Sequence, residues 1–225
     1  MNDLLSAAKG RSDDWVQLIG SIVDIDSGPG DSAGMSAVFD VMSAELAALG
    51  FESERRVTDG PDVLVARRRS SNSEPLRIAL IGHADTVFAK GTPTDRPFTR
   101  QDDRLTGPGV ADMKAGLVVA LGGMQLVGDR VLDSLDITFI VNGDEESGSA
   151  DSRATILDLA SNLDAALVFE AGRQPNVIVK SRRGAHRFDV VVKGRAAHTG
   201  VNPQDGANAI EAMAHHVLAI QELGR

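Results

Sequence analysis

The sequence predicts an α/β protein in which a largely parallel central sheet is flanked by helices on both faces. Four short apolar runs have the length and composition of strands that are buried on both faces. Segments with apolar residues at helical spacing separate the later runs, and strands that alternate with helices are typical of parallel sheets. The runs are DVLVA from residue 62, LRIALIG from 76, LDITFIVN from 135 and DAALVFE from 164.

Two helices are expected before the first of these strands. Ser12 is a suitable N-cap for the first helix, whose apolar residues follow at helical spacing and stop near SGPGD at 27–31. The second helix is expected from about Ser32 to Leu49, because Gly50 readily takes the left-handed conformation that ends a helix.

Two further helices are expected between the later strands. Residues 113–127 lie between the second and third strands, and residues 154–160 lie between the third and fourth. The polar segment RRRSSNSEP, at 67–75, is expected to form a solvated turn between two strands.

The sequence pattern changes after Glu170. NVIVKS and AHRFDVVVKG alternate apolar and polar residues, as a half-exposed antiparallel strand does. A domain boundary is therefore expected near Gly184, between a domain at 1–183 and the start of a second, α+β domain at 184–225. A helix is expected from about 208 to 223, so the second domain would contain one strand and one helix.

Composition and charge exclude several classes of function. The 225 residues include 23 Lys and Arg against 32 Asp and Glu, a net charge of −9, which argues against nucleic-acid or anionic-membrane partners. The chain has no cysteine, so disulfides, thiolate nucleophiles and Cys-based zinc sites are excluded. We find no run of signal-peptide type at the N-terminus and no obvious membrane span, and we expect a soluble cytoplasmic protein.

Histidine and acidic residues follow directly after the predicted inner strands. In open α/β sheets, functional groups gather just past the carboxyl ends of the strands, and these ends share one edge in a parallel sheet. A further aspartate stands in GPGVADMKAG, in the loop before a predicted helix. The candidate residues are His83, Asp85, Asp112, Asp144, Glu145, Glu146 and Glu170.

Each candidate alone also has an ordinary structural interpretation. His83 and Asp85 lie on one side of an extended chain and suit a metal ligand with its supporting carboxylate, but the pair also suits a surface turn. Asp112 suits a helix cap, and the adjacent Glu145 and Glu146 suit a solvated loop as well as two separate catalytic roles.

The group as a whole is harder to explain without a bound cation. Glu170 closes an apolar run, where a carboxylate needs a partner. One histidine and at least four carboxylates at one sheet edge would repel one another unless cations neutralised them. Two divalent metals would do so, and the His and carboxylate ligands fit zinc, with manganese or cobalt as substitutes.

Four segments follow one another in the sequence: GHADTVF at 82–88, GPGVADMKAG at 107–116, NGDEESGS at 142–149 and FEAG at 169–172. In this order, they resemble the M20 family of co-catalytic zinc aminoacylases and carboxypeptidases, most of all its glutamate carboxypeptidases of the carboxypeptidase G type. IDSGPGD, at 25–31, and VVKGRAAHTG, at 191–200, also match, so the resemblance covers nearly the whole chain. It implies a zinc-peptidase catalytic domain followed by a lid and dimerisation domain.

The resemblance also implies a role for each candidate residue. His83 and Glu170 would bind the first of two Zn²⁺ ions, Glu146 would bind the second, and Asp112 would bridge them. Asp85 would orient His83, and Glu145 would act as general base and acid. His198, in the lid, would stabilise the oxyanion at the site of the partner subunit in a homodimer. The bond between Asp112 and Met113 would be cis. His186, His215 and His216 match no motif and are expected to be structural or surface residues.

The implied reaction is the hydrolysis of an amide bond that releases a C-terminal amino acid, expected to be acidic like glutamate, from a peptide or N-acyl amino acid. Two cations would lower the pKa of a water and polarise the carbonyl, and Glu145 would move the proton to the leaving amine. Two alternatives stay open. One is a related N-acyl amino acid deacylase, and the other is a non-catalytic α/β module that binds metal.

The chain departs from the family pattern at its end. Family members supply one more His ligand for the second metal, and a carboxylate-binding lid arginine, from segments beyond the matched region. This chain stops at Arg225, inside the lid, so we expect either a fragment or a truncated gene product. With its second metal site incomplete, the chain alone is expected to hold one metal tightly and to be inactive.

Overall fold

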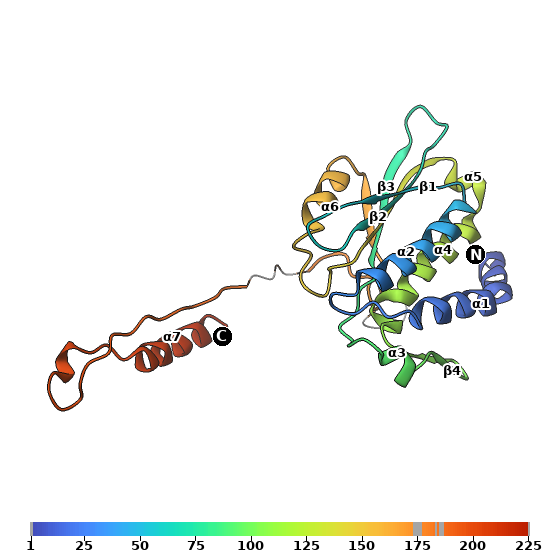
Figure 1. The fold of residues 1–225 in the computed structure, drawn as a ribbon. Helices are drawn as coiled ribbons and strands as arrows, with labels where there is room; N and C mark the ends of the chain where they lie inside the picture. The colour runs from blue at the N-terminus through green and yellow to red at the C-terminus, as the bar shows by residue number, and fades with distance from the viewer. Residues whose placement is uncertain (1, 173–176, 183, 185–186, 225) are drawn as a thin grey trace. The chain divides into compact units, whose positions relative to one another are not determined.

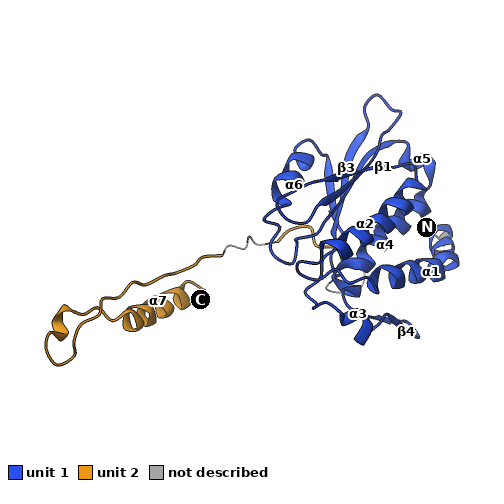
Figure 2. Cartoon of the chain, in the orientation of Figure 1, with its two compact units in different colours: residues 1–177 blue, residues 178–225 orange. Residues whose placement is uncertain are grey.

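The computed structural model describes residues 2–172, 177–182, 184 and 187–224, which fall into two units (Figure 1). Residues 1–177 form the first unit and residues 178–225 the second (Figure 2). The predicted α/β fold is confirmed in the first unit, where helices cover a five-stranded sheet. The domain boundary predicted near Gly184 lies slightly further along the chain than this division.

The sheet has the strand order β1-β2-β6-β3-β7. Strands β6, β3 and β7 run parallel, whereas β2 runs antiparallel to both β1 and β6. The four predicted strands are present as β2, β3, β6 and β7, and β1 was not predicted. The bounds are β1 Glu52–Arg56, β2 Val63–Arg68, β3 Leu76–His83, β6 Leu135–Asn142 and β7 Ala165–Val168.

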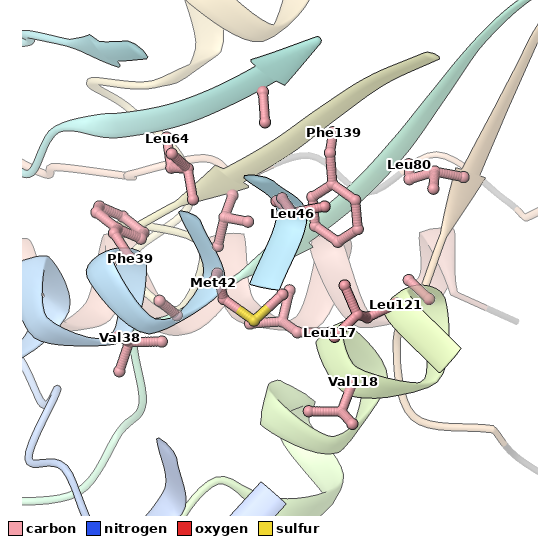
Figure 3. Close-up of a cluster of buried hydrophobic side chains, with 14 of the residues drawn as sticks. Val38, Phe39, Met42, Leu46, Leu64, Leu80, Leu117, Val118, Leu121 and Phe139 are labelled. Atoms are coloured by element: carbon pink, nitrogen blue, oxygen red, sulfur yellow. The ribbon is translucent and has the colours of Figure 1, made fainter. Parts of the chain in front are cut away.

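The two faces of the sheet are covered by different helices because side chains alternate along each strand. Leu64 and Ala66 of β2 pack toward α1, α2 and α4, in a cluster that also contains Phe139 of β6. Figure 3 shows the side chains of α2 and α4 meeting the sheet in this cluster. The alternate residues Val63 and Val65 pack on the opposite face, near α6. The bounds are α1 Asn2–Val23, α2 Ser32–Ala47, α4 Ala115–Val127 and α6 Arg153–Ala160.

The N-terminal helix begins well before the predicted cap at Ser12. The hydroxyl of Ser12 donates to the carbonyl of Lys9 within the helix, so it caps nothing. The second helix begins as predicted, with the Asp31 side chain accepting from the backbone N–H of Gly34 at 3.0 Å. It stops before Gly50, whose φ of 78° is the left-handed value expected there.

By length and hydropathy alone, Val110–Val127 would qualify as a membrane span, whereas no stretch of that length was expected from the sequence. Its helical part is α4, which buries Leu117 and Leu121 in the core of the first unit. The backbone at Asp112 and Met113 is not helical, so the apolar segment is not one continuous helix. The apolar character of this segment is therefore explained by core packing.

Strand β7 is exposed, although its sequence predicted burial on both faces. The side chain of Leu167 is 50% exposed and that of Val168 is 59% exposed. Strand β7 is an edge strand whose one partner among the described residues is β3, and its apolar side chains have few neighbours to pack on. Two short helices, α3 and α5, and the β4–β5 hairpin complete the first unit. The bounds are α3 Thr92–Asp95, β4 Thr99–Gln101, β5 Arg104–Thr106 and α5 Asp129–Leu132.

In the second unit, the strand predicted within AHRFDVVVKG is wrong for its described part. Residues 187–194 join no ladder, and the one bridge in this part of the described chain pairs Arg195 with Ala207. An alternating sequence forms a strand only when a neighbour pairs with its backbone. The predicted helix is present as α7 (Ala209–Leu223), capped by the Asn208 side chain. It exposes His215 and His216, and His186 lies outside the described residues.

Candidate metal centre

Three strand ends meet at one edge of the sheet in the first unit. Strands β3 and β6 pair in parallel up to His83 and Asn142, their last residues. Strand β7 runs parallel to β3 on its other side, and the backbone N–H of Phe169 still donates to the carbonyl of Ile81 at 3.0 Å. His83, the loop that follows Asn142 and Glu170 therefore emerge next to one another, as the parallel pattern predicted.

Two glycines allow the loop before α4 to approach these strand ends closely. A Cβ on Gly82 would lie 2.5 Å from Cε of Met113, and a Cβ on Gly116 would lie 2.0 Å from the carbonyl oxygen of Phe169. The backbone N–H of His83 points at the Met113 sulfur, 3.2 Å away. The bond between Asp112 and Met113 is cis, as the family resemblance implied. Asp112 lies beside His83, with its Oδ1 3.1 Å from Nε2 of the imidazole.

His83, Asp112 and Glu170 form a compact cluster of possible metal ligands. One ligand atom of each lies within 4.8 Å of the others. His83 Nε2 is 3.1 Å from Asp112 Oδ1, 3.7 Å from Glu170 Oε1 and 3.8 Å from Glu145 Oε2. Ligands of a tetrahedral zinc lie roughly 3.4 Å apart, since each is about 2.1 Å from the metal. The donor types and their spacing thus fit a zinc-sized cation.

The imidazole of His83 is completely buried and held by Asp85. Its Nδ1 lies 3.0 Å from the backbone carbonyl of Asp85 and 3.3 Å from Oδ1 of the same residue. Burial works to lower the pKa of His83, but the carboxylates of Asp85 and Glu170 outweigh it and raise the pKa to about 11. Without a metal, a protonated His83 therefore balances the surrounding carboxylates, and a bound cation would replace that proton.

The carboxylate of Asp85 also holds the loop after β6. Its Oδ1 accepts from the backbone N–H of Glu145 at 3.2 Å, and its Oδ2 accepts from that of Glu146 at 2.9 Å. The backbone N–H of Ala84 donates to the carbonyl of Asn142 at 2.9 Å, next to this contact. Asp85 thus links the segment of His83 to that of the two glutamates.

A second buried carboxylate, Asp144, organises the far side of the same loop. Its Oδ2 accepts from the backbone N–H groups of Asp151 and Ser152, at 2.9 and 3.0 Å, and its Oδ1 accepts from the Asn142 amide at 3.0 Å. Burial acts to raise the pKa of Asp144, but hydrogen bonds from Ser152, Asn142 and Asp151 lower it overall. Asp144 stays ionised and fixes the loop that carries Glu145 and Glu146.

The two glutamates themselves face an acidic environment. Burial raises the pKa of Glu145, and the nearby carboxylates of Glu170, Asp85 and Asp112 add to this effect against the opposing charge of His83. Burial likewise raises the pKa of Glu146, and Asp112 is the main carboxylate that adds to it. Both side chains would be stabilised in their charged form by a cation at this edge.

Sequence reasoning assigned no role to Asp144, Ser27 or Lys114. Ser27 and Lys114 are buried and bond to backbone carbonyls beside the cluster. Burial lowers the pKa of Lys114 to about 8, although Asp26 and Asp24 oppose this effect. Lys114 falls within the helix that the sequence predicted over 113–127, where nothing in the pattern indicated that its ammonium would be buried.

His198 lies in the second unit. Its Nδ1 accepts from the backbone N–H of Gly200 at 3.1 Å, and its own backbone N–H donates to the Asn202 side chain at 3.1 Å. A neutral His198 therefore carries its proton on Nε2. Its predicted role as an oxyanion donor stays a prediction.

A sequence model of peptidase family M20/M25/M40 matches residues 79–222. The chain is 34% identical over 224 residues to carboxypeptidase G2 of Pseudomonas sp. (strain RS-16), covering 96% of this chain and 53% of that protein. It is 29% identical over 187 residues to succinyl-diaminopimelate desuccinylase of Burkholderia ambifaria, covering 77% and 49%. The chain thus spans about half the length of these curated relatives.

Solved structures support the same fold. The chain resembles a tripeptidase from Staphylococcus aureus with a TM-score of 0.61 and 21% identity, over 90% of this chain and 55% of that one. It resembles human carnosine dipeptidase 1 with a TM-score of 0.59 and 23% identity, over 74% and 40%. At this level of identity, the likeness is one of fold.

Proposed function

The chain belongs to peptidase family M20/M25/M40, and on this basis we propose that it provides the metal centre of a hydrolase that cleaves amide bonds. The observation that carries the proposal is the convergence of His83, Asp112 and Glu170 within 4.8 Å. Glu145 approaches the same imidazole nitrogen to 3.8 Å, so a candidate base lies beside the candidate ligands. Ligands and base together are what metal-assisted hydrolysis requires.

We propose that His83, Asp112 and Glu170 hold the first cation and that Asp112 and Glu146 contribute to a second. Zinc fits this His and carboxylate set, and manganese or cobalt could substitute. The chemistry that two such cations supply is activation of a water and polarisation of the amide carbonyl. Three ligands are a normal number for a catalytic zinc, whereas Asp112 and Glu146 give the second site two among the described residues.

The role proposed for Glu145 is proton transfer. It takes a proton from the attacking water and returns it to the departing amine. In the metal-free protein, burial and the nearby carboxylates raise the pKa of Glu145. A cation at this edge would oppose that effect and keep the carboxylate ionised, which is the form that accepts a proton. Asp85 supports the reaction by holding the backbone N–H groups of Glu145 and Glu146.

We propose that His198 donates a hydrogen bond to the oxyanion from the partner subunit of a homodimer formed through the lid. Support comes from its tautomer, since Gly200 occupies Nδ1 and leaves the proton on Nε2. The proposed substrate is a peptide or N-acyl amino acid that loses a C-terminal acidic residue. The similarity to carboxypeptidase G2 supports this substrate, and the similarity to a desuccinylase supports an N-acyl amino acid deacylase as the second candidate.

Metal analysis of matched variants tests the proposal. In a longer form of the protein that turns over N-acyl glutamate or dipeptides, Asp112→Ala is expected to lose bound metal, because it removes a ligand shared by both sites. Glu145→Gln in the same form should keep the metal and lose turnover. Metal content measured by elemental analysis, with turnover measured in parallel, separates the two roles. Purified protein that takes up no zinc, manganese or cobalt would contradict the proposal and favour a module without catalysis. On its two-ligand second site, the 225-residue chain alone should bind one metal tightly and show negligible turnover.

A further inference from the structure

The segment between α1 and α2, residues 24–31, lies directly on the chain that follows His83. The Ser27 hydroxyl donates to the carbonyl of Ala84 at 2.7 Å, and the Ser27 carbonyl accepts from the backbone N–H of Thr86 at 2.9 Å. These two bonds flank Asp85 on both sides. A Cβ on Gly28 would lie 1.9 Å from the carbonyl oxygen of Phe88, so the two segments are in backbone contact. Residues 24–31 therefore support the strand end that carries His83.

The same segment contacts the loop of Asp112 through one lysine. Lys114 stands two residues after Asp112, is 1% exposed, and its Nζ donates to the carbonyl of Ile25 at 2.8 Å. Among the described residues, the carbonyl of Ile25 is the hydrogen-bond partner of this ammonium, and the charges of Asp26 and Asp24 act on it without forming an ion pair. Its one direct partner is thus a backbone carbonyl only two residues from Ser27.

Burial of an ammonium costs desolvation free energy, which a hydrogen bond to a single carbonyl offsets only in part. An apolar residue of the same length would fill the space without the desolvation cost of the charge. An apolar residue could not make the hydrogen bond from Lys114 to the Ile25 carbonyl, which fixes the backbone of residues 112–114 relative to residues 24–27. The segment at 24–27 is in turn fixed to residues 84–86 by Ser27. The two loops that carry His83 and Asp112 thus share one support.

We propose that Lys114 is a positioning residue of the metal centre, which sets Asp112 against His83 through Ile25 and Ser27 before a metal binds. The inference rests on the proposed function, because it takes His83 and Asp112 as ligands of one cation. The distance that this support sets is the 3.1 Å between His83 Nε2 and Asp112 Oδ1. Preorganised ligands bind tightly because the ordering is complete before the metal arrives.

Zinc affinity of Lys114→Met, measured on the 225-residue chain by competition with a coloured chelator, tests the proposal. Methionine has a similar length and no donor, so it removes the bond to Ile25 and keeps most of the packing. We expect the zinc dissociation constant to increase about 10–100-fold, as for other residues that support metal ligands. Lys90→Met is the control for the loss of a lysine, because Lys90 is 81% exposed and its ion pair is with the side chain of Asp31, at the end of the segment, outside the bonds made by Lys114 and Ser27. Its zinc affinity should equal that of the wild type.

A second variant and the melting temperature separate positioning from general stability. Ser27→Ala removes the bond to Ala84 and should increase the zinc dissociation constant about tenfold. In the double variant of Lys114→Met and Ser27→Ala, the increase should be smaller than the product of the two single increases, because both residues act through one support. A lower melting temperature of the metal-free protein with unchanged zinc affinity in both variants would overturn the proposal and leave Lys114 with a structural role. If Lys114→Met does not fold, Ser27→Ala decides alone. Absence of zinc binding by the wild type would instead overturn the proposed function, and this inference with it.

Discussion

Replacing Asp85 with asparagine tests how far the metal centre depends on one buried carboxylate. Both oxygens of Asp85 accept backbone N–H groups, from Glu145 at 3.2 Å and from Glu146 at 2.9 Å. Asparagine has the same size but presents one oxygen and one NH₂ group. Whichever way the amide turns, one of the two glutamate N–H groups then faces a donor in a site that is 4% exposed.

The loss can be estimated from these contacts. A hydrogen bond to a charged acceptor contributes about 1.5–3 kcal/mol, and a buried N–H left without a partner costs about 1–3 kcal/mol. His83 loses less, because its Nδ1 also lies 3.0 Å from the backbone carbonyl of Asp85, which the substitution keeps. We therefore expect the loop of Glu145 and Glu146 to be destabilised by about 3 kcal/mol, or roughly 100-fold in an equilibrium constant.

The effect should fall unevenly on the two proposed metal sites. Binding at the site of Glu146, and turnover, should weaken roughly 100-fold, while the site of His83, Asp112 and Glu170 should lose about tenfold or less. Stepwise zinc titration of a longer form of the protein that turns over substrate, with turnover measured in parallel, gives the zinc affinity of each site. Asp151→Asn is a suitable control, since this exposed carboxylate lies in the same loop and its side chain holds no backbone group. Equal weakening of both sites, or none, would refute the assignment of Asp85 as the support of the glutamate loop.

Three further predictions concern packing and pH. Gly116→Ala should lower the free energy of unfolding by about 1–3 kcal/mol, because its Cβ would meet the Phe169 carbonyl. Gly123→Ala, in the same helix, has open space around its Cβ and should raise the free energy of unfolding by about 0.5–1 kcal/mol. Urea denaturation measures both values, and a stabilising Gly116→Ala would contradict the close approach. Zinc affinity should fall by up to about tenfold per unit as pH falls from 8 to 6, because the pKa of His83 near 11 means that its proton must leave; a flat profile would contradict this. The lowered pKa of Asp144 contributes stability that is present above the ordinary pKa of an aspartate and is lost as pH falls through the lower folded value. Asp144→Asn should therefore flatten the acid limb of a curve of unfolding free energy against pH. An unchanged acid limb would contradict this contribution of Asp144.

The fold was predictable where burial leaves a pattern in the sequence. Strands β2, β3 and β6 are apolar because both faces of the sheet are covered, and their sequences show it. Strand β1 was missed because its sequence ESERR has no apolar residue. It is an edge strand, held by its ladder to β2 and by an ion pair of Glu54 with Arg67 at 2.7 Å. Pairing partners of this kind are not visible in a local sequence pattern.

The same distinction applies to the metal centre. His83 and Glu170 were placed together from the sequence because the ends of parallel strands share an edge. Asp112 was predicted in the loop before a helix, and its place beside them was implied by the family resemblance. The contacts of Asp85 with two backbone N–H groups and of Lys114 with a backbone carbonyl were not predictable in this way. Every residue has such backbone groups, so the sequence does not indicate which of them a buried charge will meet.

The acidic residues of this site divide into two kinds, and the division explains why the centre requires a cation. Asp85 and Asp144 point at backbone N–H groups, which satisfy their charge without any metal and hold the loop after β6 in place. Glu145 and Glu146 follow Asp144 directly, yet burial and neighbouring carboxylates raise the pKa of both. Three consecutive acidic residues thus have different electrostatic environments. Backbone N–H groups stabilise the charge of Asp144, whereas the charged forms of Glu145 and Glu146 need a positive charge at the sheet edge. In the metal-free protein the protonated His83 is the cation at the centre of this group, and a metal that displaces its proton would take over the same role with a larger charge.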